Sequence, residues 1–150
     1  MTAIEKEIQQ KSFESNRHKA HINILFTASY ISGITNKTLK PFDISAQQYN
    51  IMRILKGQHP KAASIKLLTE RMLDKMSNAS RLVEKLRRKG YISRVECPED
   101  RRQVNVKLTE EGLNVLKEST EALDEAAKFM NNLTEKEAGL LSDYLDKIRD

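Results

Sequence analysis

The sequence of 150 residues contains one cysteine, five glycines, three prolines and no tryptophan. The lone Cys97 excludes an intramolecular disulfide and a metal site built from two or four cysteines. So few glycines and prolines exclude collagen-like and low-complexity chains. No apolar run approaches the roughly 18 residues of a membrane-spanning helix, and residues 1–21 lack the apolar run of a signal peptide. We therefore expect a single soluble domain that stays in the cytoplasm and has no membrane partner.

Sequence motifs of the common enzyme classes are also missing. The chain has no glycine-rich phosphate loop, no G-x-S-x-G nucleophile elbow and no H-E-x-x-H zinc motif. His18 and His21 share a helix face, but two ligands do not make a metal site. We expect neither an enzyme nor a bound cofactor or metal.

Charge is distributed unevenly along the chain, whose net charge is +5. Residues 61–107 hold thirteen basic and six acidic side chains, whereas residues 108–150 hold five basic and eleven acidic ones. A basic middle segment favours a polyanionic partner such as nucleic acid. A merely solvated basic face remains the alternative, because charge alone does not decide between them.

Helix patterns dominate both ends of the chain. Apolar residues at three- and four-residue spacing predict one long helix from near Ile4 to near Lys37. A capping box at Ser45 predicts a second helix, which Gly57 ends. Thr109 caps a later helix through residue 130, and a capping box at Thr134 opens the last one.

The middle of the chain predicts shorter elements. Ser64 caps a short helix, and Asp74 caps another helix that runs to Lys89. Residues 91–96 and 104–108 have the alternating pattern of strands, with a charged loop between them. The fold class is therefore mainly α with a small β-hairpin, in the order of a winged helix-turn-helix.

The helix predicted from Asp74 has two contrasting faces. At 100° per residue, one arc carries apolar side chains: Met76, Ala79, Leu82, Val83 and Leu86. The opposite arc carries small polar groups and then cations: Ser77, Asn78, Ser80, Arg81, Lys85 and Arg88. Short polar side chains followed by cations suit a helix that reads the major groove of DNA. An ordinary amphipathic surface helix has the same pattern, so the alternative stays open for this helix taken alone.

The stretch LTERMLDKMSNASRLVEKLRRKGYISRVECPEDRRQVNVKLTEEG, residues 68–112, resembles the DNA-binding core of the MarR (multiple antibiotic resistance regulator) family of transcription regulators. The resemblance rests on Asp100-Arg101-Arg102, on the alternating strand that follows, and on the sequence LTEEG at residues 108–112. It is strong from Pro41 to Leu116 and follows only the helix pattern elsewhere.

The resemblance implies a bacterial regulator, usually a repressor that a small ligand releases, acting as a homodimer on a pseudo-palindromic double-stranded operator. It implies dimerisation helices at about 1–40 and 110–150 around a winged-helix lobe at about 45–108. Apolar stripes on the terminal segments independently favour a symmetric partner, since a monomer of this size leaves them unburied.

The resemblance also assigns site residues. It places Ser77, Asn78, Ser80, Arg81 and Lys85 in the recognition helix, Arg102 at the tip of the wing, and Asp100 as an acid that braces the wing. The charged loop supports this assignment, because exposed Arg101 and Arg102 suit a minor-groove probe.

The inducing ligand is less constrained by the sequence. The resemblance implies a cleft for small aromatic compounds, which four aromatic side chains are candidates to line: Phe26, Tyr30, Phe42 and Tyr49. Equally, these four belong to the core. Two other functions remain as alternatives: a winged helix that binds only proteins, and a regulator that responds to metal or through the Cys97 thiol.

Overall fold

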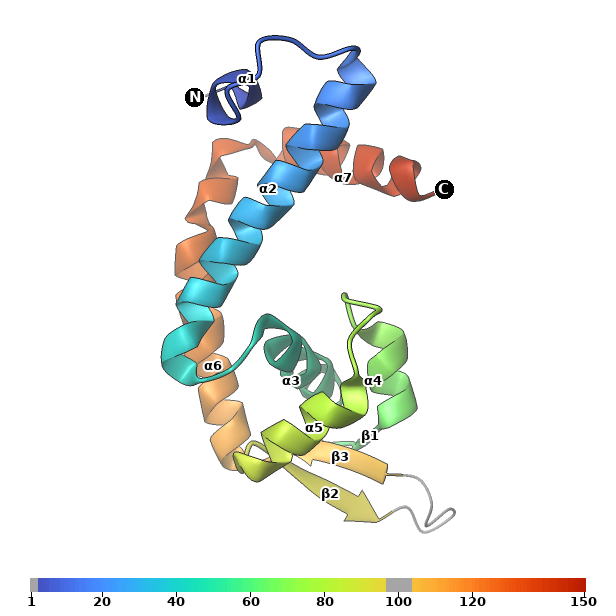
Figure 1. Ribbon diagram of the computed structural model, residues 1–150. Helices are drawn as coiled ribbons and strands as arrows, with labels where there is room; N and C mark the ends of the chain where they lie inside the picture. Colours follow the sequence, from blue (N-terminus) through green and yellow to red (C-terminus); the bar gives the residue numbers. More distant parts are fainter. Residues whose placement is uncertain (1–2, 97–103) are drawn as a thin grey trace. The chain divides into compact units, whose positions relative to one another are not determined.

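The computed structural model describes residues 3–96 and 104–150. The chain forms two compact units, one that ends at Lys37 and one that begins at Thr38. Among the described residues, no helix combines the length and the apolar character needed to cross a membrane. The architecture is mainly α-helical with a small antiparallel sheet, as the sequence predicts (Figure 1).

The first unit contains α1 (Ile4–Glu7) and most of α2 (Asn16–Leu39). The prediction of one continuous helix from near Ile4 was wrong. Gln9 adopts a left-handed conformation (φ 54°), which ends the first helical turn. Ser15 then accepts a hydrogen bond of 3.1 Å from the His18 N–H, the geometry that starts a new helix.

The second unit begins where Pro41 interrupts α2, in the 3₁₀ turn η1 (Lys40–Phe42). Helix α3 (Ala46–Gln58) has the predicted capping box: Ser45 Oγ accepts from the Gln48 N–H at 3.2 Å, and Gln48 Oε1 accepts from the Ser45 N–H at 2.9 Å. The predicted stop at Gly57 was wrong, because the helix continues to Gln58. Gly57 is not left-handed, whereas Gly90 is (φ 80°).

A short helix and a small sheet follow. Ser64 caps α4 (Ile65–Arg71) by accepting from the Leu67 N–H at 3.2 Å, as predicted. The predicted hairpin is present as β2 (Ile92–Glu96) paired with β3 (Val104–Leu108). An additional strand, β1 (Ala63–Ser64), pairs antiparallel with the other edge of β3, giving the order β1-β3-β2.

The C-terminal helices begin where the sequence predicts. Thr109 caps α6 (Glu110–Ala126) by accepting from the Gly112 N–H at 3.0 Å, and a Thr134–Glu137 capping box opens α7 (Glu135–Arg149). The α-helix that was predicted to continue through residue 130 ends earlier. From Ala127 the chain tightens into the 3₁₀ segment η2 (Ala127–Asn132).

The core of the second unit lies among α3, α4, α5 (Ala79–Arg88) and the sheet, which gather into one lobe, while α6 leads from the sheet to η2 and α7 (Figure 1). Its fully buried apolar side chains come from these elements, from the last residue of α2 and from the residue after α4: Leu39, Ile51, Met52, Leu55, Leu68, Met72, Leu86 and Val106. Burial of such side chains is worth roughly 1.5–3 kcal/mol each. This lobe holds α5 against the sheet and leaves its opposite face free.

Candidate nucleic-acid interface

The predicted recognition helix starts four residues later than the sequence suggested. Asn78 is the N-cap of α5, and its Oδ1 accepts a hydrogen bond of 2.9 Å from the Arg81 N–H. Asp74 instead organises the preceding turn, where it accepts from the Met76 N–H at 3.0 Å and from the Ser77 hydroxyl at 2.8 Å. The prediction that Asp74 caps this helix was therefore wrong, and Ser77 and Asn78 precede the helix.

The turn before α5 also corrects the predicted apolar face. Met76 was placed on the core-facing arc, yet it is 93% exposed, because the chain at this residue is not helical. Hydrogen bonds from the Ser77 hydroxyl and from the Met76 N–H lower the pKa of Asp74 below its usual value. Asp74 therefore stays ionised and holds the turn that presents Ser77 and Asn78.

Within α5 the two faces are separated as predicted. Ala79, Val83 and Leu86 are buried against the core, whereas Ser80, Arg81, Lys85 and Arg88 are exposed. The first turn of the helix contains no acidic residue, so the positive end of the helix dipole is not neutralised there. With its Oδ1 committed to the cap, the Asn78 side chain retains an amide N–H₂ group for donation. The predicted DNA-reading residues therefore lie together on one accessible surface.

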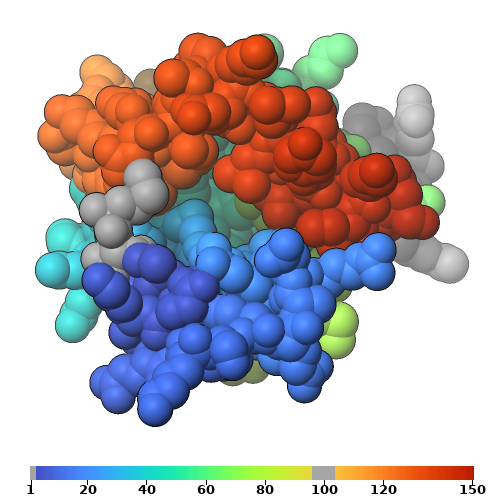
Figure 2. Space-filling view, turned by 90° about the horizontal axis from the view of Figure 1, so that it is seen from above, coloured from blue at the N-terminus to red at the C-terminus, as the bar shows by residue number. Residues whose placement is uncertain are grey.

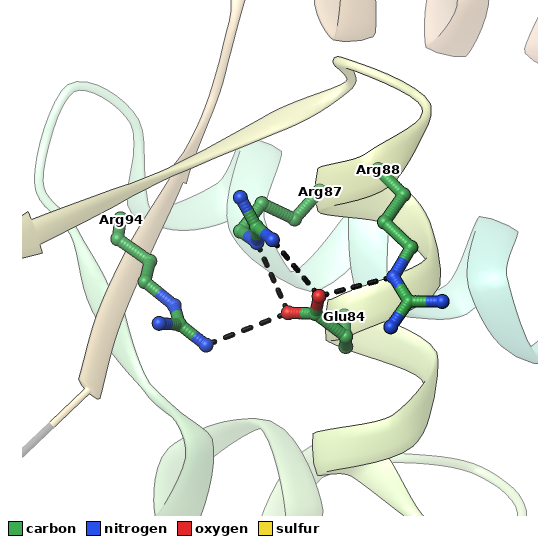
Figure 3. Close-up of polar contacts among 4 residues, drawn as sticks. All are labelled: Glu84, Arg87, Arg88 and Arg94. Atoms are coloured by element: carbon green, nitrogen blue, oxygen red, sulfur yellow. Dashed lines mark hydrogen bonds and ion pairs between the residues drawn. The ribbon is translucent and has the colours of Figure 1, made fainter.

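An acidic residue on the same surface was missed by the sequence reasoning. The Glu84 carboxylate binds three arginines, two from α5 and one from β2 (Figure 3). Hydrogen bonds from Arg87 and then Arg88 lower the pKa of Glu84 to about 2. The three- and four-residue spacing to Arg87 and Arg88 was a visible signal for part of this cluster. The bond to Arg94 had no such signal, because it depends on how the sheet packs against the helix.

The wing residues Asp100, Arg101 and Arg102 lie in 97–103, outside the described residues, as does Cys97. The strands on either side of this loop are paired, with Glu96 opposite Val104. The loop therefore joins adjacent strand ends, which is the connection that the predicted hairpin requires.

The four aromatic residues predicted for a ligand pocket divide between the two units. Phe26 and Tyr30 line an open hollow of about 410 Å³ along α2, together with Ser29, Gly33, Ile34 and Lys37. Phe42 and Tyr49 pack against the core of the second unit, where the Tyr49 hydroxyl lies 3.0 Å from Thr120 Oγ1. The structure brings Phe26 and Tyr30 to one surface, whereas Phe42 and Tyr49 take part in core packing.

His18, one of the two histidines on α2, contacts an aromatic ring and a carboxylate. The His18 ring contacts Phe13 edge-on at 5.6 Å between centroids, and its Nδ1 lies 4.0 Å from a carboxylate oxygen of Glu14. Throughout residues 3–96 and 104–150, no group of three His, Cys, Asp or Glu side chains is placed to hold a metal ion.

The terminal helices expose apolar side chains. Helix α7 has no buried residue and is open to view in Figure 2, in red. Its exposed apolar residues are Leu140, Leu141, Tyr144 and Ile148. Helix α2 likewise exposes Leu25, Phe26, Tyr30 and Ile31. Such a concentration of exposed apolar side chains is typical of a surface that another protein covers.

Comparison with known proteins identifies a matching family model and several solved structures with a similar fold. Residues 44–104 match the family model described as the MarR family. A MarR-like transcription regulator from Bacillus cereus is 25% identical, with a TM-score of 0.77 over 89% of this chain and 96% of that one. A mutant MarR from E. coli, complexed with operator DNA, is 21% identical, with a TM-score of 0.74 over 98% of this chain and 99% of that one.

A further structural neighbour was solved with a small molecule. The organohalide-sensing transcriptional regulator RdhR in its 2,4-dichlorophenol-bound form is 21% identical, with a TM-score of 0.79 over 93% of this chain and 85% of that one. The TM-scores show that these neighbours share the fold of this chain over most of its length. Residues 44–104 therefore match the MarR family model, within a fold that MarR-type transcription regulators share over nearly the whole length of this chain.

Proposed function

We propose that this chain is a sequence-specific transcription regulator that binds double-stranded DNA as a homodimer. The observation that carries the proposal is α5, which turns an exposed polar and basic face outward while its apolar face is fixed in the core. The E. coli relative with the same fold is complexed with operator DNA, which supports the same use of the fold here.

The chemistry of the α5 surface suits direct reading of bases. Ser77, Asn78 and Ser80 are short, so they fit where the helix meets base edges in the major groove. Arginine pairs with guanine through two hydrogen bonds, and such a pair discriminates by about 1–3 kcal/mol, while the amide N–H₂ group of Asn78 donates to a base acceptor. Arg81 lies one turn into the helix, within reach of a base edge, and Lys85 follows it toward the phosphates. These five residues form the proposed major-groove contact.

The wing supplies the second contact in this proposal. The loop between β2 and β3 carries Arg101 and Arg102, whose guanidinium groups suit a narrow minor groove with its enhanced negative potential. Asp100 braces the loop rather than touching DNA. This part of the proposal rests on the sequence pattern and on the paired strands that flank the loop.

Dimerisation is supported by the exposed apolar side chains of α2 and α7. Covering these two surfaces with a second copy of the chain removes apolar area from water at about 25 cal/mol per Å². The segments at about 1–40 and 110–150 form the dimer in this proposal, and residues from about 45 to 108 form the DNA-binding lobe. A two-fold dimer then meets a pseudo-palindromic operator.

Regulation by a small aromatic ligand is the remaining part of the proposal. Phe26 and Tyr30 offer aromatic faces to the hollow on α2, and RdhR was solved with a chlorinated phenol. A ligand that binds one arrangement of the dimer better than another shifts DNA affinity by its differential binding energy. We propose a repressor that releases its operator when such a ligand binds, acting in the cytoplasm where bacterial DNA lies.

Selection of bound duplexes from a random pool, combined with light scattering, tests this function. We expect a dimeric mass and an enriched inverted repeat whose half-sites lie about one helical turn apart. A winged helix that binds only proteins predicts no enrichment and no salt-dependent retention on DNA. A monomeric mass, or equal affinity for selected and random duplexes near physiological salt, contradicts the proposal.

A further inference from the structure

Glu84 is the centre of a cluster that spans two elements of the lobe. The Arg87 guanidinium group donates two hydrogen bonds to this carboxylate, from Nε to Oε2 at 3.0 Å and from Nη2 to Oε1 at 2.9 Å. Arg88 donates from Nε to Oε1 at 3.2 Å, and Arg94 donates from Nη2 to Oε2 at 3.4 Å. Arg88 and Arg94 approach the carboxylate from opposite sides (Figure 3). One carboxylate therefore orients three cations at once.

Glu84 carries a negative charge on the face of α5 that is proposed to meet DNA, where a negative charge is unexpected. At 100° per residue, Glu84 lies between Ser80 and Arg88 on the exposed arc of α5. A bare carboxylate at that place repels phosphates. Three bound arginines leave the cluster with a formal charge of +2, so the surface stays attractive to DNA. Glu84 therefore orients the three arginines without making this surface repel DNA.

Each arginine keeps donors for another partner. The side chains of Arg88 and Arg94 are 75% and 61% exposed, whereas that of Glu84 is only 31% exposed. A guanidinium group has five N–H donors, and Glu84 uses at most two from each arginine. The remaining donors are available to phosphate oxygens, which arginine binds through paired N–H groups.

The cluster also joins the two DNA-binding elements of the proposed function. Arg87 and Arg88 belong to α5, whereas Arg94 belongs to β2, the strand that leads into the wing loop. A free arginine side chain loses conformational entropy when it is fixed. Contacts with Glu84 restrict these side chains before DNA arrives.

We propose that Glu84 is a positioning residue for DNA specificity, which holds Arg87, Arg88 and Arg94 as one phosphate-binding surface in register with the recognition helix. The inference rests on the proposed DNA-binding function and adds a residue and a role to it. Held in place, the three arginines meet phosphates only when α5 is seated on its preferred bases. Released from Glu84, they reach the phosphates of any duplex.

The substitution Glu84→Gln tests this role, because it keeps the shape of the side chain and removes the charge. We expect affinity for random duplex to rise about two- to fivefold, with a salt dependence steeper by up to about one unit per half-site. We expect the ratio of operator to random-duplex affinity to fall by the same factor of about two to five, because the freed arginines gain contacts on random duplex that the held arginines already make on the operator. The assay is fluorescence anisotropy with both duplexes at several salt concentrations.

Three further variants separate positioning from simple loss of charge. Glu70→Gln removes the same charge from α4, and within the described residues Glu70 forms no ion pair. Glu84→Asp keeps the charge on a shorter stem and should restore part of the specificity ratio. In the double variant Glu84→Gln with Arg94→Ala, the loss of specificity should be smaller than the sum of the two single losses.

The outcomes distinguish this inference from the proposed function. A wild-type protein that selects no operator contradicts the function itself. A wild type that selects an operator, with Glu84→Gln behaving like Glu70→Gln or keeping its specificity ratio, overturns the positioning role alone. Additive effects in the double variant overturn it as well. Circular dichroism of each variant establishes that the comparison is made between folded proteins.

Discussion

Gly112 lies directly against the backbone of Tyr91. A Cβ atom at Gly112 would overlap the Tyr91 carbonyl oxygen and lie 2.9 Å from its carbonyl carbon. The same carbonyl accepts a hydrogen bond of 3.1 Å from the Thr109 N–H, and the Thr109 hydroxyl donates to the Gly90 carbonyl at 2.7 Å. The first turn of α6 is therefore closely packed on the turn that connects α5 to β2.

Gly112→Ala should destabilise the protein by about 1–3 kcal/mol or more, since the obstructing atoms belong to the backbone and cannot rotate away. Urea unfolding measures the change. Gly57→Ala is the matched control, because no heavy atom lies within 4 Å of a Cβ there and Gly57 is inside α3. Alanine at that position should leave stability unchanged or raise it by up to about 1 kcal/mol. A similar loss in both variants would show that close packing at Gly112 is not the cause.

Local chemistry explains which parts of the fold were predictable. The caps at Ser45, Ser64, Thr109 and Thr134 were all predicted, because a capping hydrogen bond joins residues two or three positions apart. The alternating strand after the wing was predictable for the same reason, since its period of two is written in adjacent residues.

Competition between local signals explains some errors. Asp74 and Asn78 are both good caps, and the sequence does not show which of them begins α5. In the structure Asp74 is committed to the turn and Asn78 to the helix. The left-handed conformation of Gln9 was not predicted either, because no glycine or proline at this position signals the end of a helix.

Contacts between residues far apart in the chain could not be predicted from the sequence patterns. Strand β1 has only two residues, too few for a visible period, and exists because Ala63 lies opposite Val106. The bond from Arg94 to Glu84 likewise depends on the packing of β2 beside α5. The sequence therefore predicted which side chains of α5 are buried and which are exposed, but missed the acid that joins the helix to the sheet.

Arg81→Ala should weaken binding to the selected operator by about 1–3 kcal/mol and flatten discrimination between operators that differ at one base pair. The reason is that Arg81 stands on the exposed face one turn from the Asn78 cap, the position that the proposed function assigns to a base edge. A panel of single-base operator variants measures the effect. Arg53→Ala, at an exposed position of α3 that is assigned neither to DNA nor to the dimer, is the control for loss of a cation. Equal weakening on every duplex would assign Arg81 to phosphates instead of bases.

Arg102→Ala should weaken binding to many sequences alike, because the minor groove distinguishes chiefly A·T from G·C pairs. The salt dependence of affinity should fall by about one unit per half-site, since each protomer loses one cation that contacts the minor groove or a phosphate. The same operator panel, measured at two salt concentrations, provides the comparison with Arg81→Ala. A changed preference at the bases that α5 contacts would show that the wing and the helix have been assigned to the wrong grooves.

Glu84 should give the stability of the protein a pH dependence in the acid range. Its pKa is lowered from the usual 4.5 to about 2 in the folded chain, mainly by the hydrogen bonds from Arg87 and Arg88. A carboxyl group whose pKa is lower in the folded state stabilises that state above its unfolded pKa, and this stabilisation is lost as the pH falls toward the folded pKa. The difference in free energy of unfolding between wild type and Glu84→Gln should therefore be constant at about pH 5 and above, and shrink steadily from about pH 4.5 downward. Urea unfolding of both proteins at constant ionic strength measures this difference, in which the titration of all other carboxyl groups cancels. A difference that stays constant down to about pH 3 would mean that the arginines do not hold Glu84 in its ionised form.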